Sequence, residues 1–395
     1  MWIPKTEAEI DNAVANNSLE ETVTFDAKKE IPVKNPETAK DVSAMANTAG
    51  GVLIYGIGED ENGFPNVLNP ILLEGQRERI DGILRTSIDE IPVFKISAIQ
   101  TQADSSKGYL IVVVPPSERA PHMVIVKGER RFYGRGETGN YVLSQAEVAR
   151  LYERRKIAES NILPILEENI RQFPIEEDNG FAHLHVVIKP VLQDENLLDK
   201  ALLPQQNYIQ LLNTSLEKII ELNVFKKSIE PDIYIKNWLR RADGFLSKMY
   251  EPSAGNYEKY ALYLEVNFDG SGSLFCNRAA ETIIQRNYED KWFYSDVVAG
   301  NTIKFLFLFS ELYKRASYFG MVDIGVGLTG LENSIEQYVR NSFDRNYHYD
   351  KSDYRRAKRV SAMLLEENPK QVAADLLMPL INALSQGKYN PFEKK

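Results

Sequence analysis

The sequence predicts a mixed α+β protein, with an N-terminal α/β domain over residues 1–156 and a C-terminal α+β domain over residues 157–395 that ends in helices. Three observations lead to this prediction. A chain of 395 residues is too long for one typical core. Its 43% hydrophobic residues suffice to bury large cores. Segments with strand periodicity alternate with segments of helical spacing, as in sheets covered by helices.

The chain begins with a predicted helix and strand. Thr6 and Glu9 form a capping box, which is typical of a helix N-terminus. Residues 22–28 then alternate with period two, so that apolar side chains face a core. Because strand side chains alternate between faces, Asp26 and Lys28 are expected on the same face of this strand.

A second helix and a buried strand are predicted next. Residues 39–49 repeat apolar side chains at helical spacing, and Gly50-Gly51 ends that helix. Residues 52–57 are continuously apolar, which is typical of a central strand that is covered on both faces. An acidic turn, residues 58–63, ends this strand.

The remainder of the first domain predicts further strands between two helices. One helix covers residues 80–88, and strands are expected near 93–99, 109–114, 123–126 and 131–133. Ser144 and Glu147 form a second capping box, which begins a helix through Tyr152. The charged run 153–156 marks the exit from the domain.

The second domain predicts both element types. Helices are expected near residues 205–222 and 232–250, strands at 183–188 and 260–267, and a closing helical hairpin at 351–385. The basic stretch Lys351–Arg359 would begin that hairpin as a helix. Its cations favour either a second phosphate-contacting face or an ordinary solvated surface.

Composition excludes several classes of protein. No apolar run approaches the roughly 20 residues of a membrane span, and the N-terminus has no basic segment followed by an apolar one. The single cysteine, Cys276, excludes an internal disulfide and a cysteine-rich zinc site. We therefore expect a cytoplasmic protein that does not insert into membranes.

Charge is distributed unevenly along the first domain. The whole chain has a net charge of −9, yet residues 105–156 contain 10 Lys and Arg against 5 Asp and Glu, whereas residues 1–104 contain 9 against 18. A basic strip beside an acidic half would suit a metal-dependent nuclease, which needs carboxylates for cations and basic residues for phosphates. Ordinary mixing of surface charges would give the same counts.

An acidic constellation is the first candidate site. It comprises Glu21, Asp26, Lys28, Glu59 and Asp60, which lie at the ends of two predicted strands. Carboxylates gathered from two strand ends form an all-oxygen site suited to Mg²⁺ or Mn²⁺, and a nearby lysine would stabilise charge on a reacting phosphate. The alternative is that these are solvated charges at strand ends, which are common.

A basic and aromatic strip is the second candidate site, for nucleic acid. It comprises Lys127, Arg130, Arg131, Phe132, Tyr133 and Arg135, with Lys29 beside the acidic constellation. Arginines give bidentate phosphate contacts, and exposed aromatic rings stack on unpaired bases. Alternation requires one of Phe132 and Tyr133 to face the core.

Two Gly-x-Gly-x-x-Gly matches point only weakly to a dinucleotide site. They are Gly134-Gly136-Gly139 and Gly325-Gly327-Gly330, and neither precedes a clear strand–helix–strand unit with an acidic residue at the proper distance.

The order of blocks in the first domain resembles the Schlafen-type AlbA-like domain. Glu21 and Asp26-Ala27-Lys28 are followed by Ala46-Asn47-Thr48-Ala49-Gly50-Gly51 and an apolar strand, then by Val112-Val113-Val114-Pro115-Pro116 and Phe132-Tyr133-Gly134-Arg135-Gly136. The resemblance covers most of residues 17–155. The chain departs from the family pattern in having Asp26 where Glu is usual, Ala27 where Phe is usual, and a turn that Gly58 lengthens.

The resemblance implies a metal-dependent endoribonuclease with three acidic residues. Two of them correspond to Glu21 and Asp26, and the third to Glu59 or Asp60, of which Asp60 is our choice as the third metal ligand. We therefore expect cleavage of tRNA or other RNA in antiphage defence, with RNA favoured over DNA. A non-catalytic nucleic-acid-binding regulator and a nucleotide-binding module are the alternatives. Because animal Schlafens pair two related lobes and this chain carries one, we also expect a homo-oligomer, most simply a dimer.

Overall fold

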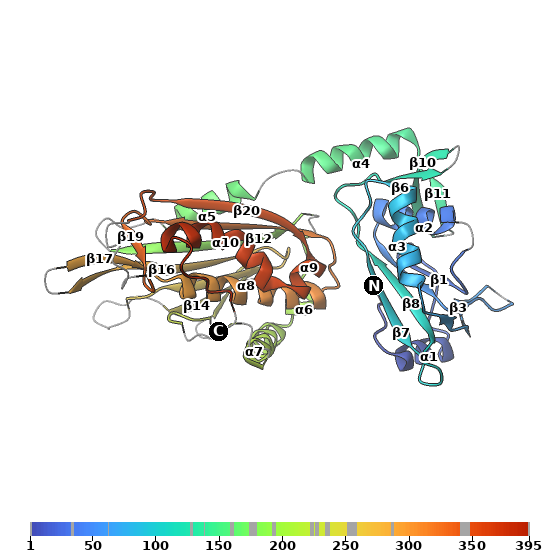
Figure 1. Cartoon of the computed structure of the whole chain (residues 1–395). Coiled ribbons are helices and arrows are strands. Elements are labelled where there is room, and N and C mark those ends of the chain that lie inside the picture. The colour runs from blue at the N-terminus through green and yellow to red at the C-terminus, as the bar shows by residue number, and fades with distance from the viewer. Residues whose placement is uncertain are drawn as a thin grey trace. The chain divides into compact units, whose positions relative to one another are not determined.

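The structure is a computed structural model, and it confirms the mixed α+β class. It describes residues 2–32, 35–61, 63–126, 129–137, 139–158, 162–173, 180–191, 195–221, 225, 229–233, 238–250, 259–285, 288–339 and 348–393. The chain divides into two compact units, Met1–Ser160 and Asn161–Lys395 (Figure 1). None of the described helices is long and apolar enough to cross a membrane.

The first unit mixes short strands with four helices among its described residues. Its helices are α1 (Glu7–Ala15), α2 (Asn35–Asn47), α3 (Gln76–Ser87) and α4 (Gln145–Ala158). Its strands are β1 (Phe25–Lys28), β2 (Gly51–Tyr55), β3 (Ile57–Gly58), β4 (Val67–Leu68), β5 (Ile71–Leu72), β6 (Ile88–Asp89), β7 (Lys95–Gln100), β8 (Lys107–Val114), β9 (Met123–Val126), β10 (Glu129–Gly136) and β11 (Gly139–Val142).

Two sheets share the core of this unit. In one, β1 pairs in parallel with β2, and β8 pairs antiparallel with β2, β5 and β7. The other has the order β11-β10-β9-β6. Apolar residues of α2 and α3 pack against Leu53 and Val112 of the first sheet and against Val124 and Tyr133 of the second. Helix α2 therefore joins the two sheets.

The predicted capping box at Ser144 is complete, whereas at Thr6 the hydroxyl caps the helix and the Glu9 carboxylate accepts from the Lys5 amide instead of the Thr6 amide. The Thr6 hydroxyl accepts a hydrogen bond from the Glu9 amide at 3.3 Å, which fixes the start of α1. The Ser144 hydroxyl accepts one from the Glu147 amide at 3.3 Å, and the Glu147 carboxylate accepts one from the Ser144 amide at 2.8 Å. The start of α4 is therefore fixed from both sides.

The second unit is built on one large sheet. Its helices are α5 (Leu163–Gln172), α6 (Asp199–Leu202), α7 (Gln205–Glu221), α8 (Ser295–Arg315), α9 (Ala362–Glu367) and α10 (Pro369–Ser385). Its strands are β12 (Phe181–Pro190), β13 (Trp238–Arg240), β14 (Gly244–Tyr250), β15 (Leu262–Asn267), β16 (Gly272–Gln285), β17 (Tyr288–Phe293), β18 (Met321–Thr329), β19 (Ser334–Glu336) and β20 (Tyr354–Ser361).

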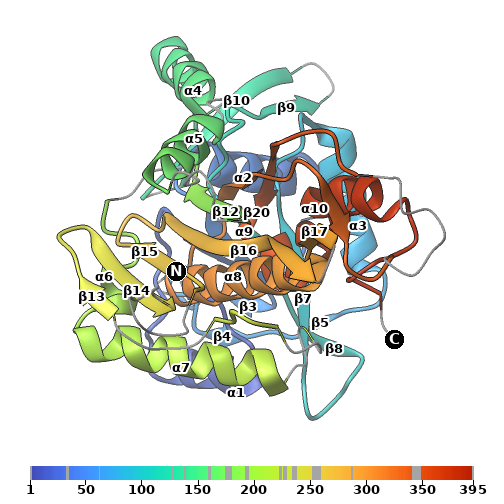
Figure 2. The same cartoon turned by 90° about the vertical axis from the view of Figure 1, so that its left-hand side faces the viewer.

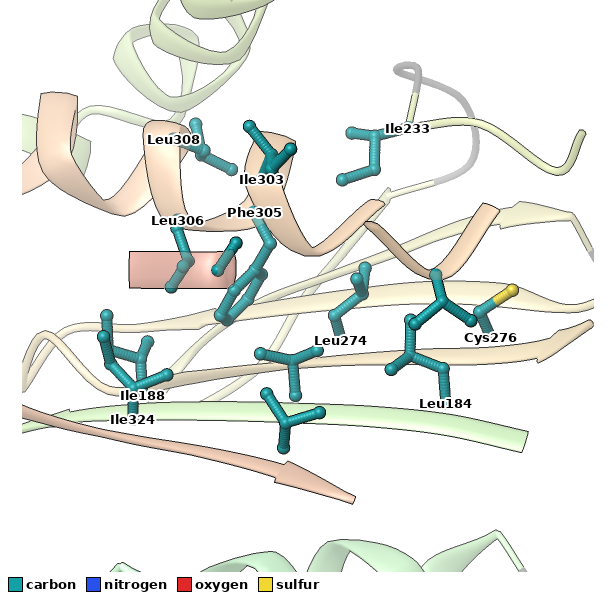
Figure 3. Close-up of a cluster of buried hydrophobic side chains, with 14 of the residues drawn as sticks. Leu184, Ile188, Ile233, Leu274, Cys276, Ile303, Phe305, Leu306, Leu308 and Ile324 are labelled. Atoms are coloured by element: carbon teal, nitrogen blue, oxygen red, sulfur yellow. The ribbon is translucent and has the colours of Figure 1, made fainter. Parts of the chain in front are cut away.

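Helices cover both faces of this sheet, whose main order is β13-β14-β15-β16-β12-β18-β20. The side chains of Ile188 and Leu274 meet Phe305 and Leu306 of the buried helix α8 (Figure 3). Val187 points to the opposite face, where it packs with Leu166 of α5. Figure 2 shows α8 lying along β16.

Two helix predictions for the second unit are wrong. Residues 232–250 were expected to be helical, but the structure has strands β13 and β14 there. Strand β14 pairs with β15, and this pairing places Phe245 in the core. The basic stretch Lys351–Arg359 lies mostly in strand β20, which pairs with β18, and the closing helices begin only at Ala362. These segments are strands because they pair with strands that are distant in sequence, and local periodicity carries no information about such pairing.

Basic residues of β20 are already neutralised. Arg359 forms two hydrogen bonds with Asp323, at 2.6 and 2.7 Å. Arg355 contacts Glu167 of α5 at 2.6 Å, and Lys358 pairs with Asp375 of α10. These ion pairs leave β20 with less positive charge available to bind phosphate than its sequence suggests.

The glycine matches lie in the wrong structural context for a dinucleotide site. Gly134, Gly136 and Gly139 belong to the β10–β11 hairpin and not to a strand–helix junction. On β18, a Cβ atom at Gly327 would lie 3.0 Å from Ile170 of α5. That glycine allows α5 to pack closely on the sheet.

Candidate nucleic-acid interface

Strand β1, at one end of the strand order of the first sheet, carries the candidate residues Asp26 and Lys28. It pairs in parallel with β2, with Asp26 opposite Leu53 and Lys28 opposite Tyr55. Asp26 is only 2% exposed, although sequence periodicity places it on the face away from the apolar side chains. A carboxylate so deeply buried requires charged or hydrogen-bonding partners.

Arg135 supplies that partner from β10. Its Nη1 donates to Asp26 Oδ2 at 3.1 Å, its Nε donates to the Thr22 carbonyl at 3.2 Å, and its Nη2 donates to the Phe25 carbonyl at 3.3 Å. The residue is 5% exposed. The guanidinium of Arg135 thus joins β10 to β1 inside the fold, which weighs against the predicted contact of this residue with phosphate.

Lys28 and Asp41 complete this polar cluster. Lys28 Nζ lies 3.2 Å from Asp26 Oδ2 and 3.7 Å from Asp41 Oδ2. Asp41, on α2, also accepts a 2.6 Å hydrogen bond from the Asn140 side chain. Sequence analysis did not identify Asp41, because it lies within a helix that was predicted from the spacing of its apolar residues alone.

Glu21 and Asp41 of this cluster have raised pKa values. Desolvation and the neighbouring Asp26 carboxylate raise the pKa of Glu21 to about 7. Burial raises the pKa of Asp41 to about 6, against the lowering effect of Lys28. Three carboxyl groups thus share two cations, Lys28 and Arg135, and a proton binds readily near neutral pH.

Glu59 and Asp60 lie in the loop after β3. Both carboxylate oxygens of Asp60 are used within this loop: Oδ1 accepts from the Phe64 amide at 3.0 Å, and Oδ2 accepts from the Asn66 side chain at 2.8 Å. Asp60 thus stabilises its own turn, in the manner typical of aspartate in loops.

The expected metal ligands do not fit a divalent cation. Within the described ranges, no three His, Cys, Asp or Glu side chains are placed to hold one metal ion. The carboxylate of Asp26 already pairs with two cations, Lys28 at 3.2 Å and Arg135 at 3.1 Å, so its negative charge is balanced without a metal ion. The expected set of Glu21, Asp26 and Asp60 is therefore replaced by an internal ion-pair network that includes Asp41.

The remaining basic residues of the strip behave differently from Arg135. Arg130 and Arg131 are exposed, and neither forms an ion pair with a residue that the structure describes. Lys29 is also exposed, and its carbonyl accepts a 3.3 Å hydrogen bond from Asn69. Lys127 lies outside the described residues. Tyr133 is the aromatic residue of the strip that faces the core.

A cleft opens beside these two arginines. It has a volume of about 410 Å³. Its walls come from β10, β11 and α4 and the segment between them: Arg130, Arg131, Phe132, Val142, Leu143, Gln145, Val148, Ala149 and Tyr152. The rings of Phe132 and Tyr152 meet edge to face, with centroids 6.4 Å apart. Aromatic walls next to unpaired cations suit a ligand that is both flat and anionic.

The Ala46–Gly51 block has a structural role that explains its residues. The Asn47 side chain donates to the carbonyls of His122 and Tyr133, at 3.1 and 2.8 Å, and accepts from the His122 amide at 2.7 Å. Gly50 has φ +74°, and a Cβ atom there would lie 2.6 Å from Pro116. The block thus anchors the end of α2 to the segments that carry the candidate interface.

The first unit is similar to known proteins. Residues 21–144 match the family model described as Schlafen, AlbA_2. Among solved structures, the N-terminal domain of a RecG-related protein from Nitrosomonas europaea is similar, with 19% identity and a TM-score of 0.24. That similarity covers 36% of this chain and 97% of the other. No curated protein matches the chain.

Proposed function

We propose that the Schlafen, AlbA_2 domain at residues 21–144 gives this protein a nucleic-acid-binding function, and that binding rather than cleavage is its main activity. The observation that carries the proposal is the exposed pair Arg130 and Arg131, which lies beside an aromatic cleft and forms no ion pair among the described residues. Unpaired surface arginines bind phosphate without first breaking an internal ion pair.

The distribution of charge supports this proposal. Residues 105–156 contain twice as many basic as acidic residues, 10 against 5, although the whole chain is acidic. Association with phosphate releases counterions, so even a few free arginines give salt-dependent affinity. RNA is the preferred partner in this proposal, in line with the resemblance to animal Schlafens.

Metal-dependent cleavage of RNA, with a role in antiphage defence, is the second candidate. The cluster of Glu21, Asp26 and Asp41 favours a nuclease, because Glu21 and Asp41 have raised pKa values and such carboxyl groups are typical of catalytic sites. The ion pairs of Asp26 with Lys28 and Arg135 weigh against it. Structural ion-pair networks also perturb pKa values, and this cluster has the connections of such a network.

The test measures binding and cleavage in the same samples. The full chain is titrated into tRNA, total RNA, single-stranded DNA and duplex DNA, with Mg²⁺, Mn²⁺ or a chelator. We expect binding that does not need metal, with intact nucleic acid recovered. Metal-dependent products that disappear in a Glu21→Gln variant would instead establish the nuclease. Failure to bind any of the four would refute the proposal.

A pair of arginine variants provides the control. Arg131→Gln should weaken binding to all sequences alike and reduce the salt slope by roughly 0.7 to 0.9 for one lost phosphate contact. Arg85→Gln removes the same charge from α3, where Arg85 pairs with Asp81 at 2.6 Å. It should leave affinity and its salt dependence unchanged.

A further inference from the structure

We infer that the cleft between β10, β11 and α4 holds one unpaired base of a single-stranded nucleic acid. This inference rests on the proposed function and specifies the form of nucleic acid that it requires. The family match ends at residue 144, whereas one wall of the cleft, from Gln145 to Tyr152, lies beyond it on α4.

The walls suit a flat ring. Phe132 and Tyr152 form an edge-to-face pair with an angle of 84° between their rings, so two aromatic surfaces meet at a corner. Val142, Leu143 and Val148 add apolar surface. The volume of about 410 Å³ lies within the range of roughly 300–1,000 Å³ that is usual for small-ligand sites.

The mouth suits phosphate. Strand alternation directs Arg130 and Phe132 to the same side of β10, so a cation stands next to the stacking surface. Arg131 also lines the cleft from the neighbouring position. A base that enters such a cleft brings its flanking phosphates towards these cations, and this is how single strands bind to aromatic and basic surfaces.

Helix α4 is held firmly enough to serve as a wall. Glu147 and Ser144 fix its start through reciprocal hydrogen bonds. Near its end, Arg155 binds both carboxylate oxygens of Glu90, at 2.6 and 2.8 Å, and Arg154 donates to the Ser117 carbonyl at 3.1 Å. A preorganised wall loses little freedom when a base binds, which favours affinity.

Base pairing should therefore oppose binding. In a duplex each base is stacked and paired, and it must leave the helix before it can enter a pocket, at a cost in free energy. Single strands and loops present unstacked bases without this cost. The cleft should accordingly favour single strands over duplexes of the same sequence.

The experiment compares two tyrosines with nearly equal exposure. Tyr152, at 45% exposure, lines the cleft, whereas Tyr141, at 43%, lies in the same unit but outside it. The full chain and its Tyr152→Ala and Tyr141→Ala variants are titrated into one 20-nucleotide RNA, single-stranded or in a duplex. The single strand carries 2-aminopurine, whose fluorescence falls when it stacks on an aromatic ring.

We expect the wild type and Tyr141→Ala to bind the single strand more tightly and to quench 2-aminopurine. Tyr152→Ala should lose about 5- to 100-fold in affinity for the single strand, the range found when one stacking residue is removed, and should not quench. Its affinity for the duplex should change much less. A second variant, Val142→Glu, tests the same cleft at an exposed position by adding a negative charge, and should give the same selective loss.

Two results would overturn the inference in different ways. Equal binding of single strand and duplex, with Tyr152→Ala and Val142→Glu both like the wild type, would remove the base pocket and leave nucleic-acid binding intact. Absence of binding to either form would refute the proposed function itself. Circular dichroism of each variant shows whether the fold is retained, so that a selective loss is assigned to the cleft.

Discussion

At the scale of single residues, the cluster around Asp26 has an excess of negative charge, with Asp26 and Asp41 buried and Glu21 exposed. Glu21, Asp26 and Asp41 contribute three carboxyl groups, and Lys28 and Arg135 contribute two cations. Because burial disfavours an uncompensated negative charge, the excess is relieved by binding a proton. The raised pKa values of Glu21 and Asp41 follow from desolvation and from the excess of carboxyl groups over cations.

Replacing Lys28 with Gln should raise both of these pKa values further. Lys28 lowers the pKa of Glu21 and of Asp41, so its loss should move Glu21 above about 7 and Asp41 above about 6. Carboxyl-carbon NMR titrations of wild type and Lys28→Gln measure the shift directly. Unchanged titration curves would show that Lys28 does not interact with these groups in solution.

The raised pKa values of Glu21 and Asp41 also predict how the stability of the fold changes with pH. A carboxyl group whose pKa is raised on folding contributes stability below its unfolded value, near 4, and that contribution is lost as pH rises through the folded value. The contributions of Glu21 and Asp41 should therefore decline between about pH 4 and pH 7. In Lys28→Gln the decline should extend to higher pH.

At the scale of secondary-structure elements, β10 has two functions on two faces. Tyr133 and Arg135 point inwards, to α2 and β1, whereas Phe132 lines the cleft against α4. The sequence places three arginines within six positions of this strand, and alternation directs Arg131 and Arg135 to the same side. Arg135 is nevertheless buried and Arg131 exposed, because Arg135 lies against Asp26 of β1.

Arg135→Gln should loosen the junction between β10 and β1. The variant leaves the buried Asp26 carboxylate without one of its two cations, and removing one partner of a buried pair costs about 3–5 kcal/mol. Hydrogen–deuterium exchange of the full chain should show faster exchange in peptides that contain β1 and β10. Peptides from the second unit should exchange as in the wild type.

Arg131→Gln is the matched control for this change. Arg131 is exposed on the same strand, so its loss should leave exchange in β1 and β10 unaltered and stability within about 0.5 kcal/mol. Equal protection of β1 in the Arg135→Gln and Arg131→Gln variants would contradict the structural role of Arg135.

At the scale of the whole molecule, one small unit carries the candidate interface. The first unit spans Met1–Ser160, and the larger second unit spans Asn161–Lys395, with its own sheet and core. A single unit of this size presents limited surface to a folded RNA. We therefore propose that two copies of the chain act together in a symmetric dimer, which would place two interfaces on one RNA.

Light scattering tests the dimer. The full chain at micromolar concentration should give particles of twice the chain mass of 45.0 kDa, with or without RNA. Dilution should then shift the mass towards a single chain. Particles of one chain mass throughout the micromolar range would contradict the proposal.

Features that depend only on neighbouring residues can be predicted from the sequence alone. Thr6 and Ser144 both cap their helices as predicted, because a helix cap needs only residues within one turn. Asp26 and Lys28 share one side of β1, since alternation is a property of the strand itself. The ordered blocks from Glu21 onward also identified the domain, which the family match at residues 21–144 confirms.

Contacts between side chains of different elements became known only from the tertiary structure. Arg135 and Asp26 are 109 positions apart, and their ion pair weighs against the expected phosphate contact. Asp41, and not the expected Asp60, belongs to the acidic cluster because α2 places it beside Lys28 of β1. Tyr152 forms a wall of the cleft because α4 places its ring against Phe132 of β10. Local patterns fix the direction of a side chain along its own element, whereas burial and partners arise from packing between elements distant in sequence.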